Sequence, residues 1–143
     1  MLDSTVYSQC RHVALGFDDA LARTRTALAA EGFGVLCEID VQATMRDKLG
    51  IARDPYTILG ACNPPLAHRA LEAEPQLGVL LPCNVVVFVE DAQTYVSAIS
   101  AQHMLGMVGN SALAPIASEV GARLERAIGH VVAEPAESEA KGR

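Results

Sequence analysis

The first part of the chain changes from a strand-like to a helix-like pattern of apolar residues. Residues 4–15 predict a first strand that ends before a glycine. Apolar residues then recur at the spacing of one helix face, which predicts a helix over residues 19–31. Asp18 can cap the start of this helix, because a short carboxylate accepts hydrogen bonds from the first free amides. Gly32 can end it, because glycine adopts the left-handed conformation of a helix stop.

A second strand and a second helix are predicted directly afterwards. Residues 33–39 alternate with a period of two, which indicates a strand and places Cys37 on its core-facing side. Asp40 can cap the next helix, and Gly50 can end it. The apolar face of this helix consists of Val41, Met45 and Leu49.

The middle of the chain predicts a strand, a helix and a hairpin. Residues 56–62 favour a strand, and Asn63 favours the start of a helix over residues 64–74, since asparagine is a good cap and proline is tolerated in a first turn. Residues 79–90 have the most strand-like composition of the chain. Residues 94–99 return as a strand after a short turn, which predicts a hairpin.

The C-terminal part predicts a short helical turn at residues 101–105 and a long helix that opens at residues 109–111. The apolar face of the long helix consists of Leu113, Ile116, Val120, Leu124 and Ala127. We therefore expect a single domain over residues 1–132, followed by a disordered polar tail at residues 133–143.

The predicted order of elements is β-α-β-α-β-α-β-β-α. Three strand–helix steps followed by a hairpin favour an α+β domain, with a mixed or antiparallel sheet and helices packed on it. A doubly wound α/β fold is the alternative. It lacks support because the only Gly-Phe-Gly segment precedes a strand, whereas a dinucleotide fingerprint lies between a strand and a helix.

Composition narrows the range of partners. The chain has a formal net charge of -6 and only 4% aromatic residues, so we expect no nucleic acid and no membrane as a partner, because both nucleic acid and anionic membranes attract basic surfaces. The longest apolar stretch, residues 77–89, is shorter than the roughly 20 residues that cross a membrane. The first residues lack a signal-peptide pattern. These features predict a cytoplasmic protein with four free cysteines.

A repeated Cys-Asn pair is the most unusual local feature of the sequence. Cys62-Asn63 stands where a strand leads into a helix, and Cys83-Asn84 stands near the start of a strand. If these strands are antiparallel neighbours, both thiols reach the same end of the sheet. With His68 nearby in the sequence, the five residues form our candidate ligand-binding site.

Three interpretations of this site remain open from the residues alone. The thiols could line a site for a small ligand or a thiol-reactive species, or one thiol could act as a nucleophile in redox or sulfur-transfer chemistry. Both could instead be buried structural residues, since free cysteine often serves as a small apolar side chain. The two thiolates and the His68 imidazole could also begin a zinc or copper(I) site. The paired ligand spacing of a structural zinc site is absent, as are a phosphate loop, a serine elbow and an HExxH motif, so we assign no metal and no cofactor and leave an enzymatic role open.

Several separated motifs, in this order, resemble the family known as domain of unknown function 302. They include Gly32-Phe33-Gly34, Gly60-Ala61-Cys62-Asn63-Pro64, Leu81-Pro82-Cys83-Asn84 and Gly106-Met107-Val108-Gly109-Asn110. The resemblance covers roughly residues 5–130 and implies a small α+β homodimer without an established activity. The family usually has a threonine in place of Cys37, and His68 is not universal, which leaves Cys62 and Cys83 as the centre of the implied site.

The leading hypothesis is therefore a dimeric domain that binds a small ligand beside Cys62 and Cys83. Half of the residues are hydrophobic, which is more than a domain of this size easily buries, and this also favours a homodimer.

Overall fold

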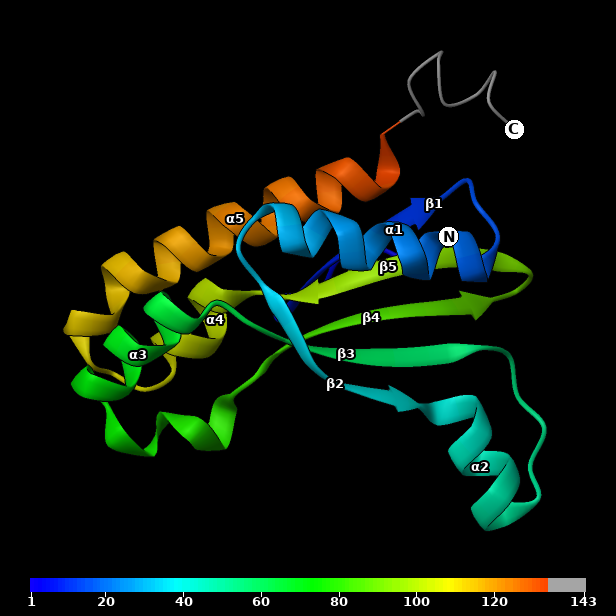
Figure 1. The fold of residues 1–143 in the computed structure, drawn as a ribbon, viewed down its shortest axis with the longest axis horizontal. Coiled ribbons are helices and arrows are strands. Elements are labelled where there is room, and N and C mark those ends of the chain that lie inside the picture. The colour runs from blue at the N-terminus through cyan, green and yellow to red at the C-terminus, as the bar shows by residue number, and fades with distance from the viewer. Residues whose placement is uncertain (134–143) are drawn as a thin grey trace.

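A computed structural model describes residues 1–133, and all but the first residue of the predicted tail lies outside the described residues. The chain forms one five-stranded sheet with helices packed on it (Figure 1). The elements are β1 (Ser8–Val13), α1 (Phe17–Ala30), β2 (Gly34–Asp40), α2 (Val41–Leu49), β3 (Tyr56–Cys62), α3 (Pro64–Ala73), η1 (Pro75–Leu80), β4 (Cys83–Glu90), β5 (Gln93–Ile99), α4 (Ala101–Gly106), η2 (Ser111–Leu113) and α5 (Ala114–Val132). The α+β class and the element order predicted from the sequence are confirmed.

The sheet has the order β1-β5-β4-β3-β2, and every neighbouring pair is antiparallel. The β4–β5 hairpin turns at Asp91 and Ala92, both of which have positive φ, as a two-residue hairpin turn requires. A β-bulge interrupts the β2–β3 pairing between Val35 and Cys37. Leu36 is the extra residue of that bulge.

Local capping signals set several boundaries as predicted. The carboxylate of Asp40 accepts a hydrogen bond from the amide of Ala43 at 2.9 Å, and α2 ends at Gly50 in the left-handed conformation. Asn63 caps α3 by accepting from the amide of Leu66. These caps satisfy amides that have no partner within the helix.

Other predicted boundaries were wrong. The first helix starts at Phe17, so Asp18 lies in its first turn and does not cap it. A carboxylate in the first turn is stabilised by the positive end of the helix dipole. The strand predicted over residues 79–90 starts only at Cys83. Residues before it form the 3₁₀ helix η1, and Pro82 has no amide to donate to a strand ladder.

The core lies between one face of the sheet and the helices α1 and α5 (Figure 1). Leu59, Val85 and Val96 project from the three central strands and are fully buried there. The apolar face predicted for α5 is buried along its whole length. No helix within residues 1–133 has both the length and the apolar composition needed to cross a membrane.

Strand β2 lies at the sheet edge, and six of its seven residues are exposed. Cys37 is therefore exposed, and its predicted place in the core was wrong. The alternation identified the strand correctly, but Cys37 points to the sheet face opposite α1 and α5, as its pairing with Gly60 indicates. Helix α2 likewise has no buried residue, and Leu49 of its predicted apolar face is 64% exposed.

Replacing Val85 by alanine should lower the free energy of unfolding by roughly 1.5–3 kcal/mol, because the side chain is fully buried at the centre of the sheet. The matched control is Val79→Ala, since Val79 is 84% exposed and should change stability by less than about 0.5 kcal/mol. Urea denaturation of both variants measures the difference. Equal losses would contradict the assignment of β4 to the centre of the core.

Candidate functional site

A cavity of ≈ 320 Å³ lies at the end of the sheet where β3 leads into α3 and η1 leads into β4. Its walls come from the sheet, α3, η1, α4 and α5, and they are almost entirely apolar. Characteristic wall residues are Phe33, Leu66, Leu77, Met104, Ile116 and Val120. Small side chains on β3 and α3, including Ala61, Ala67 and Ala70, leave the space between these walls open.

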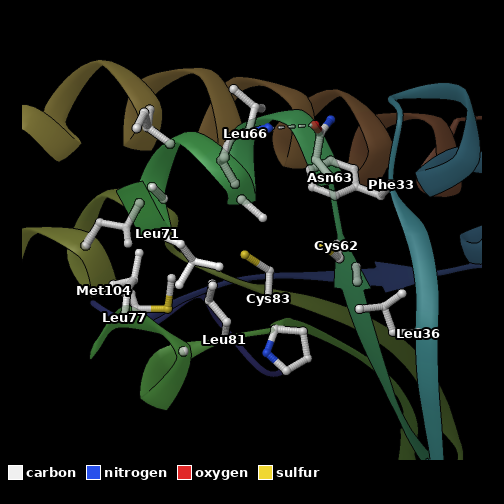
Figure 2. A pocket seen from close by; sticks show the side chains of 18 residues that line it. Phe33, Leu36, Cys62, Asn63, Leu66, Leu71, Leu77, Leu81, Cys83 and Met104 are labelled. Atoms are coloured by element: carbon white, nitrogen blue, oxygen red, sulfur yellow. Dashed lines mark hydrogen bonds between the residues drawn. The ribbon is translucent and has the colours of Figure 1, made fainter. Parts of the chain in front are cut away.

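Both cysteines of the predicted site line this cavity. Cys83 of β4 pairs with Ala61 of β3. Cys62 directly follows Ala61 in the chain, so the two cysteines lie one residue apart in the register of neighbouring strands. Cys83 is 8% exposed, whereas Cys62 is half-buried. Figure 2 shows the Cys83 thiol projecting into the space between α3 and Leu77, with Cys62 on the neighbouring strand.

Burial is the main influence on the chemistry of Cys83. Burial, and to a smaller extent the negative charge of a nearby Cys62 thiolate, raise the pKa of Cys83 to about 11. Cys83 is therefore a neutral thiol at physiological pH. A protonated thiol is a poor nucleophile and a poor metal ligand.

The Asn63 side chain stabilises the local structure through two hydrogen bonds to the backbone. It accepts a hydrogen bond from the Leu66 amide at 3.4 Å and donates to the Glu31 carbonyl at 3.5 Å. Arg123 also donates to the Glu31 carbonyl, at 2.9 Å. Asn63 thus connects the end of α1 to the start of α3 at the rim of the cavity, and its polar atoms are already engaged.

The structure does not bring the other two predicted residues to the cavity. Asn84 is exposed and pairs with Gly60, on the sheet face opposite α1 and α5. His68 projects into solvent from α3 and lies 3.6 Å from the Glu72 carboxylate. Within residues 1–133, no group of three or more His, Cys, Asp and Glu side chains is arranged to hold a metal ion.

Sequence reasoning did not include most of the cavity wall. Met104 and Leu77 were not connected to the Cys-Asn pairs, although they lie in the same cavity. One feature of the sequence could have indicated the cavity. Ala67 and Ala70 are one helical turn apart, so they share a helix face that carries little side-chain volume.

The fold and the cavity define a small α+β domain with an apolar, thiol-lined site at one end of its sheet. Residues 9–131 match the family described as domain of unknown function DUF302, and the chain belongs to this family. A crystal structure of an uncharacterized conserved DUF302 protein from Bacillus stearothermophilus superimposes with a TM-score of 0.83 at 30% sequence identity, covering 89% of this chain and 99% of that one. No curated protein matches the chain.

The rate at which iodoacetamide alkylates Cys83 in the folded protein should rise about tenfold per pH unit from pH 8 to pH 10 without levelling off. The reason is that its pKa of about 11 keeps the thiolate scarce over this range. Mass spectrometry of the Cys83 peptide measures the rate site by site. In denaturant the same peptide provides the control, and its rate should level off near the ordinary cysteine pKa of about 8.5. A plateau near pH 9 in the folded protein would contradict the burial of this thiol.

Proposed function

We propose that this domain binds a small, neutral, apolar molecule in the sheet-end cavity beside Cys62 and Cys83. The observation that carries the proposal is a cavity of ≈ 320 Å³ whose lining side chains are apolar apart from Asn63 and the two thiols. Within residues 1–133, every buried side-chain nitrogen or oxygen has a hydrogen-bond partner. A charged or strongly polar ligand would lose its hydration there and gain no partner in return.

The apolar lining of the cavity supports a ligand in preference to a purely structural role, because a contiguous apolar surface that solvent can reach usually marks a binding site. The volume of ≈ 320 Å³ equals that of about ten water molecules, and apolar cavities are poor sites for water. It also falls at the lower end of the range of about 300–1,000 Å³ that is typical of small-molecule sites.

The state of Cys83 argues against this residue as a catalytic thiol. Redox and sulfur-transfer reactions require a thiolate, whereas the pKa of Cys83 is raised to about 11 by its burial. A neutral thiol is a small, polarizable group that contacts apolar ligands well. In this role the two cysteines supply packing surface and a weak hydrogen bond, and no covalent step is needed.

Titration with the neutral fluorophore N-phenylnaphthylamine should show saturable binding to the wild-type chain, because the cavity shields the dye from water. Ala67→Phe should weaken this binding at least tenfold, since Ala67 is half-buried on α3 and its replacement places a ring inside the cavity. Fluorescence enhancement at fixed protein concentration measures both affinities.

The matched control is Ala22→Phe, the same substitution at an exposed position of α1 that does not line the cavity. This variant should bind the dye like the wild type. Absence of saturable binding to the wild type, or equal weakening by the two substitutions, would contradict the proposal.

A further inference from the structure

The Cys83 thiol is a buried donor that the single chain leaves without a partner. Its side chain is only 8% exposed and projects into the sheet-end cavity (Figure 2). Within residues 1–133 its S–H group donates no hydrogen bond. The amide of Asn63, which also lines the cavity, is already engaged with the backbone. Buried polar groups normally have a partner, so the S–H group points to a ligand that carries one acceptor atom.

Cys62 lies on the open side of the same cavity. It is half-buried, and it lines the cavity together with Leu36, which is 68% exposed. Leu36 follows Val35, which pairs with Ala61, the residue before Cys62. Solvent therefore reaches the cavity near Cys62, whereas Cys83 lies deeper. A thiol in contact with solvent can release its proton, and the thiolate is the nucleophilic form of cysteine.

The two thiols differ in their protonation. Burial, and then the negative charge of a Cys62 thiolate, raise the pKa of Cys83, so Cys83 keeps its proton when Cys62 has lost its own. The two residues belong to neighbouring strands and lie one residue apart in register. Neighbouring strands are about 4.8 Å apart. The cavity therefore combines a nucleophile near its opening with a neutral donor further inside.

We propose that the ligand is an apolar α,β-unsaturated carbonyl compound, which Cys62 captures covalently while the Cys83 S–H group donates to its carbonyl oxygen. This inference rests on the binding function proposed above, and it adds the ligand class and a chemical step. The β-carbon and the carbonyl oxygen of such a compound are separated by two carbon atoms, so one molecule spans both thiols. Its alkyl chain occupies the apolar space beside Leu77 and Met104.

The chemical step is a conjugate addition. The Cys62 thiol gives its proton to solvent, and its sulfur forms a bond to the β-carbon as the C=C π bond breaks. The electron pair moves towards the carbonyl oxygen, where the Cys83 S–H group stabilises the enolate charge that develops. A proton from water then joins the α-carbon. The product is a thioether with a saturated carbonyl group, so the step involves no oxidant, reductant or leaving group.

Alkylation of the full chain by oct-3-en-2-one, followed by mass spectrometry of each cysteine peptide, tests this step. The rate at Cys62 should saturate with reagent concentration, because the reagent is bound before it reacts. Below saturation this rate should exceed the rate at Cys37, an exposed thiol outside the cavity, at least tenfold. But-3-en-2-one has the same reactive group without the longer alkyl chain, so it should show neither saturation nor this preference.

Two substitutions of Cys83 test its role as the donor. Cys83→Ala removes the S–H group and should slow the reaction at Cys62 about tenfold, since a thiol is a weak donor. Cys83→Ser is the matched control, because it keeps a donor of similar size and should restore most of the rate. Equal rates in both variants and the wild type would contradict the donor role. Circular dichroism checks that the variants fold, and if either does not, the comparison of the two enones on the wild type decides.

The saturated ketone octan-2-one separates this inference from the binding function. It has the same chain length without the C=C bond, so it should displace N-phenylnaphthylamine and leave Cys62 unmodified. Displacement by octan-2-one, together with equal rates of oct-3-en-2-one at Cys62 and Cys37, would overturn the covalent step and leave the binding function standing. A bound dye that octan-2-one does not displace would overturn the ligand class. Absence of dye binding would overturn both proposals.

Discussion

Two α-helices cannot cover both the width and the length of this five-stranded sheet. Each helix is about 10 Å across, whereas five strands span about 24 Å. Helices α1 and α5 therefore pack mainly on β1, β5 and β4, and β2 is largely exposed at the edge, where α1 reaches it through the Arg25–Glu38 ion pair. The end of the sheet beyond α1 is closed by the short elements α3, η1 and α4 together with the first turns of α5, which bring Ile116 and Val120 to the cavity (Figure 1). The exposed edge and the cavity are two consequences of this one constraint.

The cavity exists because the short elements bring small residues to that end of the sheet. Ala61 on β3 and Ala67 and Ala70 on α3 line the cavity where larger side chains would close the space. Asn63 holds α3 in place from the rim, through bonds to the Leu66 amide and the Glu31 carbonyl. Polar contacts thus fix the frame at the rim of the cavity, and apolar side chains form the interior. This separation suits a site that selects ligands by shape and apolarity.

The sequence correctly predicted those structural features that depend on residues adjacent in the chain. The caps Asp40 and Asn63, the β4–β5 hairpin and the apolar face of α5 were all correct, because each follows from a few adjacent residues. The repeated Cys-Asn pair also indicated that Cys62 and Cys83 lie at one end of the sheet, and both line the cavity. Cys37 was placed wrongly because alternation identifies a strand without showing which of its faces the helices cover. Met104 could not be connected to Cys83, since only the packing of α4 against the sheet end brings them into one cavity.

The most direct test of the account is a crystal structure of the wild-type chain determined under xenon pressure. Xenon is neutral, apolar and polarizable, so it binds in dry cavities and does not compete for hydrogen bonds. The account predicts a well-occupied xenon site in the sheet-end cavity, in contact with Cys83, Leu77 or Met104. A cavity filled by ordered water, or closed by its own side chains and without xenon, would contradict it.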